Sequence, residues 1–397
     1  MLRFLTAGES HGPELVAIVD GLPAGIGVDQ AAIDRDLARR QGGYGRGARS
    51  TRIERDTADV VSGVVAGRTT GAPVAMRIVN RDFSNQPAYP SPLSAPRPGH
   101  ADLAGGLKFG IDDFRVVRER ASARETAARV AVGAFAKAAL APFGARVGSF
   151  VLAIGGAAAT HRPLPRLDDR ALWELHDFAE QDPVRCPDAR ASAEMRRAID
   201  AARAAGDTLG GVFCVFATGV PPGLGSYTQW DHRIDGLLAR ALCSIPAVKG
   251  AEVGPAFELS SSSGLTAQDA VRSSDGRLER GANHAGGVEG GVTNGQPVVL
   301  RAAMKPLSSV RAPVETVDLS TGASADAPYV RSDVCAVPAA AVVGEAVVAW
   351  TLATALVERF GGDRLDGMLA AAAAVREAGV RGSASGARAP SRAEAHR

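Results

Sequence analysis

The sequence predicts an α+β fold rather than a parallel sheet with regularly alternating helices. Three observations support this: strand-like and helix-like segments mix without a regular order, 46% of the 397 residues are hydrophobic, and 22% are charged. The length fits one large or two ordinary domains with an ample core. The composition excludes a disordered, collagen-like or coiled-coil chain, and the net charge of +2 argues against a dedicated nucleic-acid protein.

The first 80 residues are expected to form strands around one helix. A strand-like run, MLRFLTAG, opens the chain. Asp29 can cap a helix in which Ile33 and Leu37 share one face, and this helix should end before Gly42. The other elements expected here are a second strand, a loop and a pair of β-like runs, at 15–20, 42–52 and 58–79.

The rest of the chain is expected to combine long helices with strands. Residues 80–100 should form a proline-rich loop. Ser122 and Glu125 make a capping box at the start of an alanine-rich helix. Helices are predicted at 122–141, 191–205, 231–243 and 338–360, and strands at 147–156, 210–218, 251–259 and 296–304. We expect one domain over residues 1–379 and a disordered tail over 380–397.

Two features of the composition affect how single residues are interpreted. Glycine is unusually frequent, with 46 residues, and only four of the 45 basic residues are lysines. Because arginine replaces lysine almost everywhere, one arginine is weak evidence of function, whereas a lysine carries more weight. The lysines are Lys108, Lys137, Lys249 and Lys305.

The sequence predicts a cytoplasmic protein without a membrane anchor. We find no window of about 18 apolar residues and no signal peptide. The four cysteines are scattered, without a CxxC pair, and are interpreted as reduced thiols.

A glycine-flanked histidine follows the first strand, in the motif Gly8-Glu-Ser10-His11-Gly12. Glycines on both sides let the backbone turn sharply, and histidine suits proton transfer near neutral pH. A turn histidine bonded only to backbone is the structural alternative, and the more frequent one. The segment is not a nucleophile elbow, because GxSxG is absent.

An arginine-rich block spans residues 35–55, with a local net charge of +5. Two of its arginines lie at a helix end, where cations suit the helix dipole. Arg46 and Arg49 lie in a glycine loop with little to pack against, and the arginine fork matches phosphate and carboxylate. A small, multiply anionic ligand is therefore favoured. Nucleic acid is the rival, weakened because Tyr44 alone is available for stacking.

Two further motifs present polar side chains near the long alanine-rich helix. In PRPGHAD, residues 96–102, prolines fix the backbone that carries Arg97 and His100. In RERASARET, which opens the helix, the helix N-terminus is a ready anion site. Ser122 there can serve as a simple cap, and Arg124 can form a surface ion pair.

A glycine-rich run and two short motifs complete the candidates. The run at 281–295, GANHAGGVEGGVTNG, is either a flexible loop or a place where a flat ligand lies close to the backbone. It is neither a Walker motif nor GxGxxG. Lys305-Pro-Leu-Ser-Ser309 follows the next strand, and Arg331-Ser-Asp333 precedes the last long helix. No set of potential ligands has zinc spacing, so we expect no metal.

Together these motifs are typical of an enzyme acting on a small, multiply anionic molecule. They also resemble, in family order from residue 3 to about residue 362, the signature blocks of chorismate synthase. Seven blocks in order are far more specific than any one of them. They are GESHG, RRQGGYGRGARS, RPGHADLAGGLKFG, ERASARETAARVAVGA, NHAGGVEGGVTNG, KPLSS and RSDVCAVPAAAV.

The resemblance implies a fold, a reaction and partners. The fold would be a β-α-β sandwich, internally duplicated, with mostly antiparallel sheets and helices between them, normally in a homotetramer. The reaction would be the anti-1,4-elimination of phosphate from 5-enolpyruvylshikimate-3-phosphate to give chorismate, the last step of the shikimate pathway. This carbon–oxygen lyase needs reduced FMN without net redox change. Because no dinucleotide fingerprint is present, we expect a separate flavin-reducing system.

The resemblance also implies residue roles. His11 would protonate or hold the reduced flavin, and His100 would assist phosphate departure. Asp333 would help deliver the ring proton to the flavin, with Ser10 and Ser122 as supporting polar groups. Cofactor contacts would come from Arg120, Ala121, Ser122, Pro246, Ala247, Gly290, Lys305, Pro306, Leu307, Ser308, Ser309 and Arg331. Substrate contacts would come from Arg40, Arg46, Arg49, Arg97, Arg120 and Arg331.

Two other functions stay open. The first is a flavin-dependent NAD(P)H oxidoreductase, which would oxidise NADPH when FMN is added. The second is a non-enzymatic anion- or nucleic-acid-binding protein that uses the arginine-rich block, for which strongly salt-dependent DNA binding would be the sign.

Overall fold

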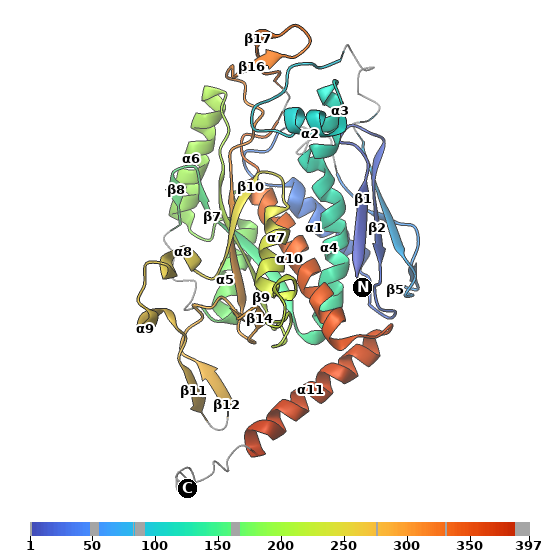
Figure 1. Cartoon of the computed structure of the whole chain (residues 1–397), viewed down its shortest axis with the longest axis vertical. Coiled ribbons are helices and arrows are strands. Elements are labelled where there is room, and N and C mark those ends of the chain that lie inside the picture. The colour runs from blue at the N-terminus through green and yellow to red at the C-terminus, as the bar shows by residue number, and fades with distance from the viewer. Residues whose placement is uncertain are drawn as a thin grey trace.

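The computed structural model has three layers, in which long helices separate two antiparallel sheets (Figure 1). It describes residues 2–47, 55–81, 83, 92–159, 167–274, 277–329 and 332–385. The first sheet has the order β1 (Arg3–Ala7), β2 (Glu14–Asp20), β6 (Val74–Val79) and β3 (Asp59–Val60). The second has the order β10 (Val248–Val253), β15 (Val298–Met304), β9 (Gly211–Thr218), β7 (Arg146–Ile154) and β8 (Ala157–Ala158).

The middle layer is built around two helices that are buried on nearly every side. It contains α1 (Gln30–Gln41), α4 (Thr126–Leu140), α7 (Ile234–Cys243) and α10 (Val337–Phe360). Helices enclosed in a core are apolar all round, as the alanine and valine runs of α4 and α10 are. Gly133 brings these two backbones together, because a Cβ there would lie 2.3 Å from the Cβ of Ala346.

The expectation that no apolar window of membrane-spanning length exists was wrong, because helix α10 is long and apolar enough to cross a membrane by length and composition. In the structure, 78% of its apolar window is buried inside the protein. This is the expected state of a core helix, so the feature is weak evidence for a membrane span.

The remaining elements cover the sandwich or extend from it. The helices α5 (Asp169–Gln181) and α6 (Ala189–Ala205) lie on the outer side of the second sheet (Figure 1). Other helices are α2 (Asp102–Phe109), α3 (Phe114–Ala121), α8 (Ala256–Leu259), α9 (Gly264–Ala267) and α11 (Leu365–Ser385), which projects from the body. Single 3₁₀ turns occupy Ala123–Glu125, Ala141–Phe143 and Trp230–His232. Four hairpins are β4 (Val64–Val65) with β5 (Arg68–Thr69), β11 (Val271–Ser274) with β12 (Arg277–Arg280), β13 (Val288–Glu289) with β14 (Val292–Thr293), and β16 (Glu315–Asp318) with β17 (Ala323–Asp326).

The predicted α+β class, with antiparallel sheets and helices between them, is confirmed. Local signals were reliable where a cap and an apolar face coincide. The Asp29 carboxylate accepts the Ala31 N–H at the start of α1, and Ile33 and Leu37 are buried. In the first sheet, β2 pairs with both β1 and β6 and carries the alternating buried residues Leu15, Ala17 and Val19.

Several predicted elements need correction. Residues 256–259 form helix α8 and not the end of a strand. Ser122 accepts the Arg124 N–H, but it caps a 3₁₀ turn that precedes α4. Glu125 does not complete the box, because its carboxylate accepts from Thr6 and Arg129.

The prediction missed α2, α3, α5 and α11. Proline, glycine or polar residues obscure the first three, and alanine dominates the last. The helix α11 continues to Ser385, past the predicted tail boundary, and residues 386–397 lie outside the described part.

Candidate functional site

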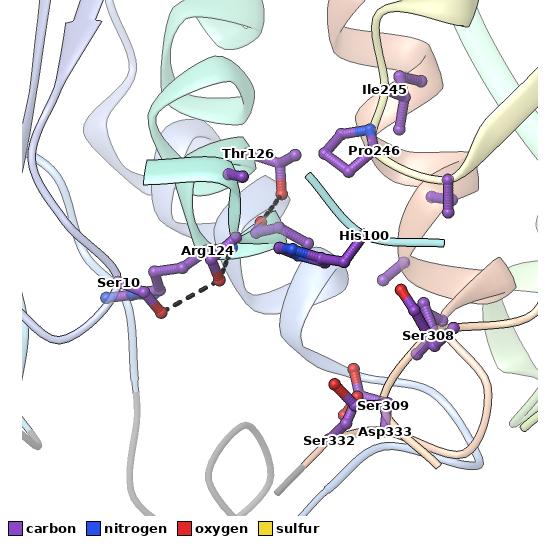
Figure 2. A pocket seen from close by; sticks show the side chains of 18 of the residues that line it. Ser10, His100, Arg124, Thr126, Ile245, Pro246, Ser308, Ser309, Ser332 and Asp333 are labelled. Carbon is purple, nitrogen blue, oxygen red and sulfur yellow. Dashed lines mark hydrogen bonds between the residues drawn. The ribbon is translucent and has the colours of Figure 1, made fainter. Parts of the chain in front are cut away.

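A cavity of about 870 Å³ opens at the N-terminal ends of the two central helices. Figure 2 shows side chains from several distant segments around it. Residues 121–126 contribute the start of α4, and residues 336–343 contribute the start of α10. Partial positive charge at two helix N-termini makes the cavity favourable for anions.

His11 is held in the cavity by a carboxylate from α3. Its Nδ1 lies 2.8 Å from Glu119 Oε1, and its backbone N–H donates to Oε2 at 2.7 Å. Burial would raise the pKa of Glu119, but the His11 hydrogen bond and charge outweigh burial and lower it. The predicted alternative, a histidine bonded only to backbone, is therefore not what the structure shows.

His100 is held by a second carboxylate. Its Nδ1 lies 2.5 Å from Asp102 Oδ1, and the Asp102 side chain is 0% exposed. Arg97 donates to the same carboxylate through Nε at 2.9 Å and to Ser309 Oγ at 2.8 Å. Burial opposes ionisation of Asp102, but hydrogen bonds from His100 and Arg97 hold its pKa well below the usual range.

Arg40 and Arg124 share one buried carboxylate. Arg124 Nη1 donates to Asp56 Oδ2 at 2.6 Å, and Arg40 Nη1 lies 3.6 Å from the same atom. Arg40 also donates through Nε to Thr126 Oγ1 at 2.9 Å. Both arginines line the cavity and are buried, so the surface ion pair considered as an alternative for Arg124 is not what the structure shows.

Asp333 faces the cavity from the segment before α10. It forms an ion pair with Arg46, and its Oδ1 accepts the Gly47 N–H at 2.6 Å. The start of α10 and the glycine loop after α1 are thus joined across about 290 residues of sequence.

Hydroxyl groups and backbone segments complete the lining. Ser122 Oγ donates to Ser10 Oγ at 3.1 Å. The Lys305 N–H donates to the Ala247 carbonyl at 2.9 Å, so two segments predicted to bind the cofactor lie together. Ala247 has a φ of +68°, a strained conformation for a residue with a Cβ.

Most predicted site residues lie in this one cavity. Those that line it are Ser10, His11, Arg40, Arg46, Arg97, His100, Ala121, Ser122, Pro246, Ala247, Lys305, Leu307, Ser308, Ser309 and Asp333. Three do not line it. Arg120 is exposed and donates to the Thr6 backbone and hydroxyl at 2.9 Å, and Gly290 lies in the turn between β13 and β14. Pro306 is exposed and does not line the cavity, and Arg49 and Arg331 lie outside the described residues.

Sequence reasoning missed several residues of the site. Arg118, Glu119 and Thr126 line the cavity but were not singled out. Arg124 also lines the cavity, but it was given a surface ion pair as an alternative and was not among the predicted site residues. An acidic residue next to two arginines, as in Arg-Glu-Arg, was an available signal for Glu119, but its partner His11 is 108 residues away.

Three described arginines of the arginine-rich block do not lie on an exposed stripe, although Arg35 and Arg55 are exposed. Arg39 donates to Glu345 and Glu180, and Arg40 and Arg46 point into the cavity. Nucleic-acid binding needs cations that reach phosphates along an exposed face. The nucleic-acid alternative therefore has no support from these three residues.

His176, Glu180 and Glu345 bring potential metal ligands within 4.8 Å of one another, although their sequence spacing gave no sign of it. Both carboxylates are already engaged by cations, since Arg39 binds Glu180 and Glu345, and Arg185 binds Glu180 at 2.6 Å. Additional positive charge is disfavoured there. This cluster is best described as a buried ion-pair network, and the absence of a metal stays a prediction.

Comparisons with known proteins agree with the order of the sequence blocks. The family model described as chorismate synthase matches residues 2–357. A chorismate synthase from Desulforudis audaxviator is 50% identical over 380 residues, covering 93% of this chain and 96% of the relative. One from Symbiobacterium thermophilum is 52% identical over 381 residues, covering 92% and 96%. A crystal structure of a chorismate synthase superposes with a TM-score of 0.78 at 41% identity, covering 97% of this chain and 98% of the other.

Proposed function

The chain belongs to the chorismate synthase family, and we propose that it eliminates phosphate from 5-enolpyruvylshikimate-3-phosphate to give chorismate. The observation that carries this proposal is a single cavity in which two carboxylate-supported histidines face several arginines. The substrate has two carboxylates and a phosphate, so the cavity matches it in charge. Loss of phosphate and of one ring proton creates the second ring double bond.

The family uses a flavin, and the cavity residues fit one. Its volume is near the upper end of the range of small-molecule sites, which leaves room for a flavin and a small substrate. Apolar side chains that suit a flat ring system are Ile245, Pro246, Met304, Ala339, Ala340 and Val343. Polar groups for the ring edge and the phosphate are Ser122, Lys305, Ser308 and Ser309. We propose reduced FMN, which when bound supplies electron density to the reacting ring without net oxidation.

The arginines bind and orient the substrate. A protein carboxylate forms an ion pair with each of four cavity arginines and so fixes its position. These arginines are Arg40, Arg46, Arg97 and Arg124. A guanidinium held in this way has already lost its rotamer freedom, so less entropy is lost when the substrate binds. We assign to Asp333 a part in removal of the ring proton, and its contacts with Arg46 and the Gly47 N–H, which fix the carboxylate, support this assignment.

The surroundings of the two histidines favour an exchange of the roles that the resemblance implies. His100 lies on a segment tied to the proposed flavin residues, because Ser308 Oγ donates to the Gly99 carbonyl at 3.4 Å. Arg97 binds Ser309 from the same segment. We therefore assign to His100 the role of protonating or holding the reduced flavin. His11, held by Glu119, is assigned to the departing phosphate.

The reaction is tested by adding the enolpyruvyl substrate to the protein with FMN under anaerobic reduction. We expect equimolar phosphate and chorismate, the latter followed by its absorbance, and no reaction without reductant. Formation of neither product by folded, flavin-loaded protein would overturn the proposal.

The histidine roles are tested with His11→Ala and His100→Ala. The His100 variant should change how the spectrum of the bound reduced flavin depends on pH, without substrate present. The His11 variant should leave that titration intact and slow phosphate release in a single turnover. The reverse pattern would restore the roles implied by the resemblance.

The assembly, the source of electrons and the compartment are also proposals. We propose a homotetramer, which sedimentation velocity would test, and an external reductant, so that purified protein with FMN should not oxidise NADPH. A cytoplasmic location is supported by the cysteines, since Cys186, Cys214 and Cys335 are free and buried.

A further inference from the structure

The cations that line the cavity differ in how their charge is balanced. The pairs in which a carboxylate faces an arginine are Arg97–Asp102, Arg46–Asp333, Arg124–Asp56 and Arg40–Asp56. Arg118 differs from these. Among the residues that the structure describes, its guanidinium has no hydrogen-bond or ion-pair partner, and its Nε is buried.

Arg118 lies next to the two carboxylates that hold the histidines, yet they do not neutralise it. Burial and the positive charge of Arg97 lower the pKa of Arg118, and Glu119 and Asp102 compensate only in part. Both carboxylates are already occupied, one by His11 and the other by Arg97 and His100. A half-buried guanidinium with an unpaired buried N–H is unfavourable in the free protein, so an anionic ligand is the natural partner.

We infer that Arg118 is a docking cation for a phosphate group held in this cavity, beyond the arginines that the family blocks identify. Phosphate is the most highly charged group expected there, and the guanidinium fork matches its oxygens. The position fits, because Arg118 precedes Glu119, which holds the histidine assigned above to the departing phosphate. This inference rests on the proposed function, and the substrate and the flavin cofactor each carry a phosphate.

Direct titration with inorganic phosphate tests the docking cation without flavin or turnover. Arg118→Met removes the charge and keeps the length, Arg118→Lys keeps the charge without the fork, and Lys108→Met on α2 removes a neighbouring exposed charge as the control. We expect Arg118→Met to weaken phosphate binding about ten- to hundred-fold, the value of one charge-assisted hydrogen bond. The phosphate affinity of Arg118→Lys should lie between those of wild type and Arg118→Met. The phosphate affinity of Lys108→Met should stay within about two-fold of wild type.

Three results would overturn the inference, two of them in the binding measurements. One is a phosphate affinity in Arg118→Met within about two-fold of wild type, and the other is an equal loss in Lys108→Met. The melting temperature is the structural readout, because removal of an unpaired buried cation should leave it equal or higher. A lower melting temperature together with weaker binding, not rescued by Arg118→Lys, would assign a structural role and also overturn it.

A second arm distinguishes the two sources of phosphate. If Arg118 binds the substrate phosphate, Arg118→Met should raise the KM for the substrate and leave the ratio of FMN to riboflavin affinity unchanged. If it binds the cofactor phosphate, that ratio should fall instead. Because inorganic phosphate binding is measured without turnover, failure of the lyase assay and failure of this inference remain distinct.

Discussion

Glu345 is a carboxylate buried within the apolar helix α10, and Glu345→Gln tests whether buried charge holds the layers together. Its side chain is 1% exposed. It accepts from Arg39 at 2.7 and 2.8 Å, from Lys137 at 2.8 Å and from Ser149 Oγ at 2.7 Å. These partners come from α1, α4 and β7, so one carboxylate joins the middle layer to the second sheet.

The size of the effect follows from what remains after the substitution. Loss of one partner from a buried ion pair costs about 3–5 kcal/mol, because the other charge stays buried. In Glu345→Gln the neighbouring cations would still be partly neutralised by two other carboxylates. Asp36 accepts from Arg39 and Lys137, each at 2.7 Å, and Glu180 pairs with Arg39 and Arg185, each at 2.6 Å. We therefore expect the free energy of unfolding to fall by about 3 kcal/mol.

The effect should depend on pH with a defined sign. Burial acts to raise the pKa of Glu345, but Lys137 and Arg39 hold it well below its usual value. A carboxyl group with a depressed pKa in the folded state stabilises the protein above its unfolded pKa, about 4.3. That contribution is lost as the pH falls through the folded value. The difference in free energy of unfolding between wild type and Glu345→Gln should therefore be fully present at pH 7 and should shrink at pH values below about 4.

Urea denaturation followed by circular dichroism, at equal chain concentrations, measures the effect. The matched control is Glu174→Gln, because Glu174 pairs with Arg170 at 2.7 Å while their side chains are 63% and 86% exposed. Solvent and salt screen an exposed pair of this kind, so its loss should change the free energy of unfolding little. A loss below about 1 kcal/mol in Glu345→Gln, or one equal to the control, would refute the reasoning.

Three further predictions concern packing and the site. Gly133→Ala should lower the free energy of unfolding by about 1–3 kcal/mol, because the added Cβ would collide with Ala346 and this outweighs alanine's better helix propensity. The control is Gly236→Ala in α7, where an added Cβ would have no neighbouring atom within 4 Å. This substitution should stabilise the protein by about 0.5 kcal/mol. Ala247→Gly relieves a φ of +68° and should raise stability by about 0.5–1 kcal/mol, and a loss would contradict this. Asp102→Asn should lower the free energy of unfolding by about 3 kcal/mol at neutral pH, because Arg97 and His100 would face a neutral amide. This difference from wild type should fade as the pH falls below about 4, where Asp102 becomes protonated in the unfolded chain, and should vanish once the pH falls through its depressed pKa in the folded state.

The fold was predictable where the information is local. Asp29, followed by the apolar spacing of Ile33 and Leu37, defines α1 almost residue by residue. By contrast, α5 has its face formed by Leu172, His176 and Ala179. A buried histidine interrupts the apolar pattern, so the helix was not recognised.

The site was predictable in its residues but not in their pairing. Motifs and resemblance identified His11 and His100, yet the carboxylate that holds His11 lies 108 residues away. Arg124 and Asp56 are separated by 68 residues. Pairings of this kind are set by how the sheet and helices stack, and no periodicity in the chain encodes them. The pairing of Asp102 with His100 could have been predicted from the sequence, because the two residues are two positions apart in one motif.

The near-exclusive use of arginine gains a physical meaning once these carboxylates are located. A guanidinium carries N–H groups on three nitrogens in a rigid plane, so a carboxylate can fix one edge while other donors face a ligand. Arg97 illustrates this, with Nε on Asp102 and Nη1 on Ser309 at the cavity wall. A lysine ammonium presents its donors from one point and cannot be held and displayed in the same way. In this chain, an arginine at the cavity therefore points to ligand binding in two cases. In the first, a buried carboxylate fixes one edge of the guanidinium, and in the second, as for Arg118, no carboxylate pairs with it.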